Sequence, residues 1–197
     1  MFGLSEYSSL TWDSAAWIYS VIIGVVLARY FMFIANLLQE PKAIKFYYPY
    51  LAFTLANILF LYVSWYTGKK TYTQIEGHTL SFALRTFTDA IACIYGLMIV
   101  PKDKLLEDFF DMKSWFMKIK KAYFFITVLN LFVREIYFVL GFIYTEMLTT
   151  EQIIGGSVFM VIMILLNLVS AFSKNDYYLS FHGTLVVVIN SIQLSAL

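Results

Sequence analysis

The chain has 197 residues, of which 60% are hydrophobic and 14% are charged, and its mean hydropathy is +0.73. Soluble domains contain about 45–50% apolar and about 25% charged residues, so this composition indicates a membrane protein. The formal net charge of +1 gives no basis for nucleic-acid binding, and a single cysteine excludes an intrachain disulfide framework.

Long apolar runs occupy most of the chain and predict one all-α transmembrane domain over residues 1–197. A helix that crosses the hydrocarbon core needs about 20 mostly apolar residues. The runs are continuous, unlike the short alternating segments of a barrel, so they favour a polytopic helix bundle. We predict about six transmembrane helices, over residues 15–38, 47–65, 79–100, 122–144, 152–172 and 177–196.

The segment between the third and fourth predicted spans is amphipathic. Its apolar residues recur every three or four positions, which predicts an interfacial helix over about 103–119 on the inner membrane surface. We expect this helix to connect two spans, with docking of a soluble or membrane protein partner as the alternative. The side chains predicted to face lipid or such a partner are Trp115, Phe116, Lys118, Lys120 and Lys121.

Lysine placement predicts the orientation. The connections after the first, third and fifth spans hold nine lysines, whereas the opposite side holds only Lys69 and Lys70. Basic connections stay cytoplasmic, so we predict a multi-pass protein of the inner (plasma) membrane with both termini outside.

All three arginines, Arg29, Arg85 and Arg134, fall within predicted spans, together with Asp89 and Glu135. Each such charge costs roughly 2.5–3.5 kcal/mol at a helix centre. We therefore expect these side chains to face the bundle interior, a water-filled cavity or a subunit interface.

Helical spacing predicts which of these groups share a face. In the third span, Ser81, Arg85 and Asp89 are four residues apart, and the last two can form an ion pair. In the fourth span, Asn130 and Arg134 share a face, while Glu135 points about 100° away. Glu135 is expected to reach a different neighbour, with Arg29 as the candidate.

Three cations against two anions leave one positive charge unpaired, and two interpretations remain open. In the first interpretation, the buried charges form a structural network that fixes the register of the helices. Alternatively, the surplus arginine lines a hydrated path or binds an anion, a lipid headgroup or a substrate carboxylate, because ionisable groups within membranes are functional by default.

Other chemical motifs are weak. His78 and His182 are the only histidines, and one pair at unknown separation is not a haem motif, so they are weak ligand candidates. HExxH, CxxC and a glycine-rich phosphate loop do not occur. We expect no metal, no cofactor and no enzymatic activity, because no nucleophile or base is accompanied by its partners.

Residues 15–125 follow a recurring order of features. An arginine-bearing first span precedes a tyrosine-rich entry at 47–50 and an aromatic exit at 64–66, and Pro101 is followed by an acidic stretch and an aromatic, basic run. This order resembles small uncharacterised bacterial multi-spanning integral membrane proteins. The resemblance implies no activity and no catalytic residue, and the chain departs from it where Lys42 and Lys45 replace an arginine cluster.

These observations predict an integral membrane protein with a buried Arg/Asp/Glu network. The leading hypothesis is a channel or polar passage for ions or small solutes, with the lipid bilayer and a second copy of the chain as partners. The alternatives are a non-catalytic accessory module, for example of a bacterial defence system, that docks a partner at the cytoplasmic face, and the substrate-binding subunit of a transporter.

Overall fold

The computed structural model describes residues 12–39, 44–74, 79–101, 109–145 and 150–195. Within these ranges the chain forms six helices and two short strands, which confirms the all-α prediction. The elements are α1 (Trp12–Gln39), β1 (Ile44–Lys45), α2 (Tyr48–Gln74), α3 (Thr79–Ile99), β2 (Phe110–Asp111), α4 (Met112–Thr145), α5 (Thr150–Phe172) and α6 (Asp176–Ser195).

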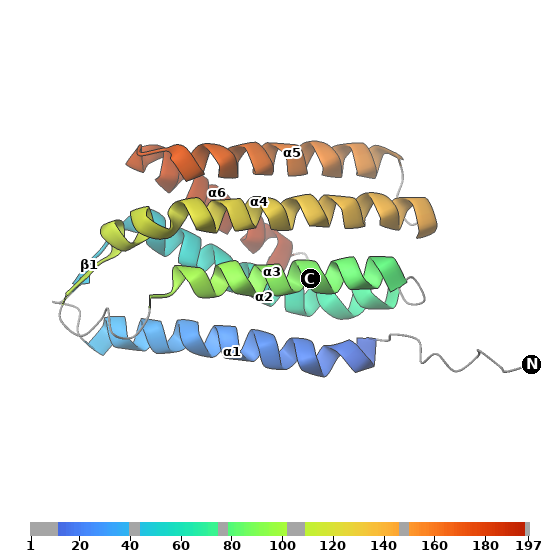
Figure 1. The fold of residues 1–197 in the computed structure, drawn as a ribbon, viewed down its shortest axis with the longest axis horizontal. Helices are drawn as coiled ribbons and strands as arrows, with labels where there is room; N and C mark the ends of the chain where they lie inside the picture. Colours follow the sequence, from blue (N-terminus) through green and yellow to red (C-terminus); the bar gives the residue numbers. More distant parts are fainter. Residues whose placement is uncertain (1–11, 40–43, 75–78, 102–108, 146–149, 196–197) are drawn as a thin grey trace, which may run out of the picture.

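Successive helices run in alternating directions along the long axis of the bundle (Figure 1). α4 packs between α3 and α5, while α6 packs along α2. In Figure 1, α6 starts beside the end of α5 and then descends obliquely away from it. This divergence separates two consecutive helices within the bundle.

Among the described residues, five helices are long and apolar enough to cross a membrane. By this criterion of helix length and composition, the protein is membrane-embedded. These candidate spans are Tyr19–Gln39, Tyr48–Gly68, Leu80–Ile99, Met112–Leu140 and Thr150–Phe172. The sixth predicted span is present as α6, which has 20 residues but is not among the five. Its polar residues His182 and Asn190 are buried against other helices, so they make contacts inside the bundle rather than with lipid.

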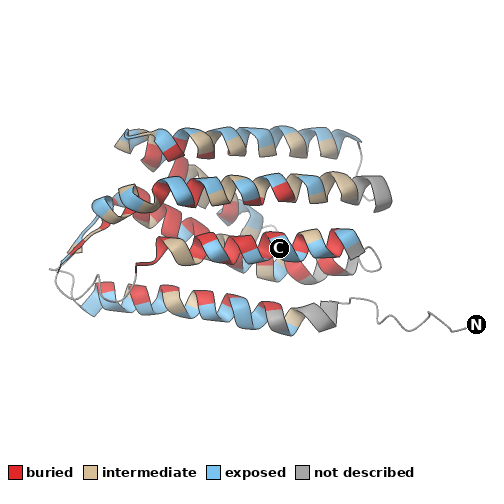
Figure 2. Cartoon of the chain, viewed as in Figure 1, coloured by how far each residue is buried: buried red, intermediate tan, exposed pale blue. Residues whose placement is uncertain are grey.

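Figure 2 shows exposed residues along the outward sides of the helices, and many of these residues are large and hydrophobic. On α1, Val25 is 61% exposed, whereas its neighbour Val26 is 1% exposed and lies in the core. Exposed apolar side chains continue on α5, with Leu165 and Val169 among them. Such surfaces are stable when they contact lipid tails rather than water.

The described part of the predicted interfacial helix has a different structure. Phe110 and Asp111 pair in parallel with Ile44 and Lys45, and residues 112–119 are the first turns of α4 rather than a separate helix. Asp111 accepts hydrogen bonds from the backbone amides of Lys113 (2.9 Å) and Ser114 (3.1 Å) and thereby caps α4. Residues 102–108 lie outside the described residues.

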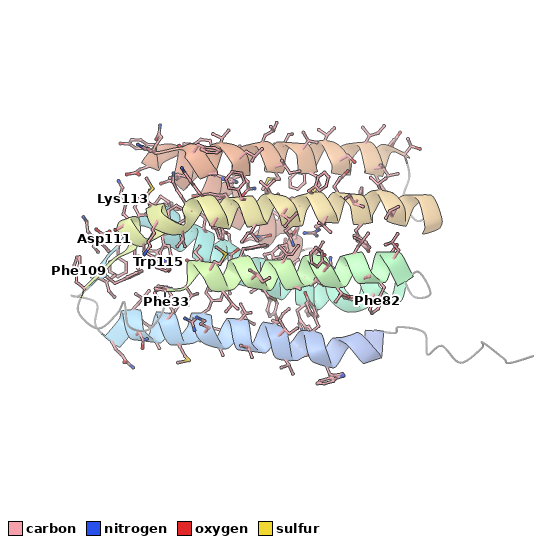
Figure 3. All side chains as sticks on the ribbon, viewed as in Figure 1. Phe33, Phe82, Phe109, Asp111, Lys113 and Trp115 are labelled. Atoms are coloured by element: carbon pink, nitrogen blue, oxygen red, sulfur yellow. The ribbon has the colours of Figure 1, made fainter. Side chains whose placement is uncertain are left out.

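Ionic contacts join several elements at this end of the bundle. Figure 3 shows Asp111, Lys113 and Trp115 gathered there, whereas Phe82 lies toward the opposite end of α3. Lys45 contacts the Asp111 carboxylate at 3.4 Å, and Lys113 contacts that of Asp176 at 2.5 Å. The Tyr47 hydroxyl also donates to Asp176, at 2.8 Å, so the start of α6 is linked to α4 and to the residue preceding α2.

These contacts predict a loss of stability in acid. Backbone hydrogen bonds from Ser114, with Lys45 nearby, lower the pKa of Asp111, and the hydrogen bond from Lys113 lowers the pKa of Asp176. A lowered folded-state pKa stabilises the folded protein above the ordinary Asp value of about 3.9, and this contribution is lost as the pH falls through the folded-state value. Thermal unfolding in detergent should show a weaker acid dependence for Asp176→Asn than for the wild type. Glu151→Gln, which removes an exposed carboxylate from α5, is the control, and an unchanged acid dependence in Asp176→Asn would contradict the prediction.

Candidate functional site

A buried ion pair within α3 is hydrogen-bonded to residues of α1 and α2. Arg85 Nε lies 3.2 Å from Asp89 Oδ2, and the two side chains are 5% and 4% exposed. The Ser64 hydroxyl accepts hydrogen bonds from Tyr19 (2.9 Å) and Arg85 (3.0 Å) and donates to Asp89 Oδ1 at 3.1 Å. The Tyr72 hydroxyl donates to Asp89 Oδ2 at 3.1 Å. Both carboxylate oxygens therefore have partners, which suits a structural role.

The third-span residues that the sequence placed on one face lie together inside the bundle. Ser81 is buried one turn before Arg85, and Cys93 is buried one turn after Asp89. Ser64, Tyr19 and Tyr72 were not predicted as members of this cluster, because each is a common residue in a span and no spacing pattern sets it apart.

Arg29 and Glu135 do not meet. The Arg29 guanidinium donates to the carbonyl oxygen of Pro101 at 3.3 Å, just beyond the end of α3. Glu135 Oε1 accepts a hydrogen bond from the Ser157 hydroxyl on α5. The expected direction of Glu135, away from the Arg134 face, agrees with this contact, but its suggested pairing with Arg29 is wrong.

A cavity of about 220 Å³ lies between α2, α4, α5 and α6, with Tyr95 of α3 at its wall. Its lining spans residues 123–138 of α4, a length of about 22 Å along that helix. Polar side chains from four helices line it: Asn57 from α2, Thr127, Asn130 and Arg134 from α4, Asn167 from α5, and Asn190 and Gln193 from α6.

Arg134 is the one charged side chain among the residues that line the cavity in the described part of the chain. No carboxylate of a described residue lies within 4.0 Å of it, and its guanidinium faces the Phe60 ring at 5.6 Å. Arg134 is partly buried, and a cation–π contact offsets part of the cost of desolvating its guanidinium but leaves its net charge uncompensated. Among the described residues only Arg85 has a carboxylate partner, so Arg29 and Arg134 both lack one, rather than the single surplus cation expected from the sequence, and Arg134 is the one that lines the cavity.

Four asparagine side chains line the same cavity as Arg134. Asn130 donates to the Thr88 carbonyl, Asn167 to the Met163 carbonyl at 2.7 Å, and Asn190 to the Ala56 carbonyl at 3.0 Å. Asn57 differs, because its Oδ1 accepts from Tyr123 while its Nδ2 is buried without a hydrogen-bond partner among the described residues. Among the described residues, Arg134 is thus the cavity-lining side chain whose hydrogen-bond donors have no partner within the protein and are available to a ligand.

His182 is fully buried outside this cavity. Its Nδ1 lies 2.6 Å from the Ser170 hydroxyl, and its ring packs between Phe53 and Phe124. His78 lies outside the described residues, and in the described ranges no group of three or more His, Cys, Asp or Glu side chains could hold a metal ion.

The predicted docking residues at the start of α4 are mostly occupied within the bundle. Phe116 is 0% exposed, stacked on Phe53, and Trp115 donates to the Ile99 carbonyl at 3.0 Å. Lys120 is 4% exposed and donates to the Ser173 carbonyl. Lys118 and Lys121 are exposed. The expectation that Phe116 and Lys120 face lipid or a partner is therefore wrong, because α4 continues into the bundle and these faces pack against α2 and α5.

No protein-family model, no curated protein and no solved structure matches the chain.

Proposed function

We propose that this membrane protein binds a small solute with one negative charge inside its helix bundle, as the binding unit of a transport process. The observation that supports this most directly is Arg134, a cavity-lining guanidinium without a carboxylate partner among the described residues. Leaving a partly desolvated charge without a counter-charge is unfavourable. A bound anion removes that cost, and ionisable groups at membrane depth mark substrate and ion pathways.

The distribution of polar groups supports a passage rather than a single point of contact. Thr127, Asn130 and Arg134 lie on successive turns of α4, and Asn57, Asn167 and Asn190 face the same cavity from three other helices. A solute therefore meets hydrogen-bonding groups at several depths. One chain supplies all of these residues, so binding does not depend on a second copy.

A partner-docking function receives less support. Phe116 and Lys120, two of the five residues expected to face lipid or a partner, are buried within the chain itself. Orientation remains part of the proposal: the end that carries Lys45, Lys113, Lys118 and Lys121 faces the cytoplasm of a bacterial cell, following the positive-inside rule.

The test is anion-dependent stabilisation of the purified protein in a neutral maltoside detergent. Sodium butyrate, substituted for sodium chloride at constant ionic strength, should raise Tm saturably. At a concentration ten times Kd the gain is about 1.4 kcal/mol, or about 3–6 °C for a chain of this size. Arg134→Gln should abolish the rise because it removes the charge that holds the anion.

Arg29→Gln is the matched control, because Arg29 donates to the Pro101 carbonyl rather than lining the cavity. It should retain the butyrate effect. An equal Tm rise in Arg134→Gln, or no saturable rise in the wild type, would refute binding at this site.

A further inference from the structure

The exposed residues of the cavity lining lie on α5 and α6. Two residues that line the cavity also reach the outer surface: Phe159 of α5, which is 41% exposed, and Gln193 of α6. Near the connection between the two helices, the Tyr178 hydroxyl donates a hydrogen bond to the Leu166 carbonyl at 3.0 Å, and His182 forms a hydrogen bond with Ser170. Beyond these contacts the ribbon of α6 runs obliquely away from α5 (Figure 1). The exposure of Phe159 and Gln193 indicates an opening of the cavity between these two helices.

Apart from Gln193, the exposed side chains beside this opening are apolar. Val158 and Ile162 on α5 and Ile192 on α6 are each half or more exposed. These side chains are stable at lipid depth, which places the opening against the hydrocarbon core rather than against water. A ligand that passes between α5 and α6 comes from the bilayer.

The inside of the cavity has two chemical characters. Arg134 and the asparagines provide a polar region with one positive charge, while Phe138, Phe159, Met160, Val186 and Ile189 provide an apolar wall. A ligand that satisfies both parts has a small anionic head and an apolar chain. Methionine and phenylalanine side chains adapt to a flexible chain.

We infer, on the basis of the function proposed above, that the ligand is a single-chain amphiphile with one carboxylate head, which enters from the bilayer between α5 and α6. Its carboxylate binds Arg134, and its chain lies along the Phe138–Met160 wall toward the opening. A carboxylate accepts two parallel hydrogen bonds from a guanidinium, which a cavity-lining Arg134 can supply.

Charge balance favours a carboxylate over a phosphate monoester. Arg134 supplies one positive charge, and no Lys lines the cavity in the described part of the chain. A monoanion neutralises that charge, whereas a phosphate close to a dianion leaves a net negative charge in a medium of low dielectric constant.

Gly156 provides a way to alter the wall without touching Arg134. A Cβ atom at Gly156 would lie 2.8 and 2.9 Å from ring atoms of Phe138, which itself lines the cavity, whereas a Cβ at Gly155 meets nothing within 4 Å. Gly156→Ala therefore displaces the Phe138 ring, and Gly155→Ala is its matched control.

The experiment uses the full chain in neutral phosphatidylcholine vesicles with a 16-carbon fatty acid that carries a photoreactive diazirine in its chain. After irradiation, mass spectrometry should locate adducts in residues 156–163 and 186–193. Unlabelled palmitate should compete and methyl palmitate should not, because the ester has no charge. Arg134→Gln should lower labelling about tenfold or more. Gly156→Ala should lower labelling, while Gly155→Ala should leave it unchanged.

Several results would overturn the inference. Equal competition by methyl palmitate would show that the head charge is not recognised, and stronger competition by lysophosphatidic acid would show that the head is a phosphate. If butyrate stabilises the wild type through Arg134 but the long-chain probe does not label the cavity, the inference fails and the proposed function stands. If neither ligand binds, both fail.

Discussion

Asp89→Asn should lower the free energy of unfolding by about 3–5 kcal/mol, because removal of one partner of a buried ion pair leaves the other charge uncompensated. The amide keeps the shape of the carboxylate and can still meet Ser64 and Tyr72, so the loss reports the charge. Arg85 has Asp89 as its only carboxylate within 4.0 Å among the described residues. Reversible unfolding in mixed micelles of dodecyl sulfate and maltoside measures the change.

The double variant Arg85→Gln/Asp89→Asn separates charge from packing. It removes both charges and should recover most of the stability that Asp89→Asn loses, which a double-mutant cycle quantifies. Glu135→Gln is the matched control, since this acid bonds Ser157 and not an arginine, and it should cost less. A double variant no more stable than Asp89→Asn would show that the pair does not act as a compensating unit.

Gly183→Ala should lower the free energy of unfolding by about 1–3 kcal/mol, the cost of overpacking a close contact. A Cβ atom at Gly183 would lie 2.9 Å from the Cβ of Ala52 and 3.5 Å from the Phe53 ring. The Ala52 Cβ is fixed to the backbone of α2, so the helices must separate. This contact helps α6 to pack along α2 and to form one wall of the cavity.

The same unfolding titration tests this prediction, with Gly24→Ala as the control. Nothing lies within 4 Å of a Cβ atom at Gly24, so that change should be neutral or stabilising by about 0.5–1 kcal/mol through helix propensity. If Gly183→Ala were as stable as Gly24→Ala, the close approach of α2 and α6 would be contradicted.

The candidate site could be anticipated in part from single-helix geometry. Spacing alone indicated that Arg85 and Asp89 pair, that Asn130 and Arg134 share a face, and that Glu135 points elsewhere. Each of these statements concerns residues within one helix, where the periodicity of 3.6 residues fixes relative directions. The partner of Glu135 was not predictable in this way, because Ser157 lies on another helix and nothing in the sequence aligns the two.

The predicted interfacial helix shows a second limit. The apolar face that includes Met112 and Phe116 is real, but periodicity cannot distinguish a face that meets lipid headgroups from one that packs on Tyr47, Tyr50 and Phe53. Both environments select the same residue types. Residues 112–119 therefore have the expected apolar periodicity, but they belong to α4 rather than to a separate interfacial helix.

Apolar runs and basic connections in the sequence determined that the protein is a bundle of helices suited to a membrane, and the excess of arginines over acids in the spans indicated that not every cation would have a partner. Only the tertiary structure decided that Arg85 alone is paired among the described residues and that Arg134 lines the cavity. In a membrane protein the lipid-facing and core-facing surfaces are equally apolar, as Val25 and Val26 illustrate. Hydropathy therefore does not specify which helix faces meet, and the divergence of α5 and α6 that leaves a cavity around Arg134 arises from packing alone.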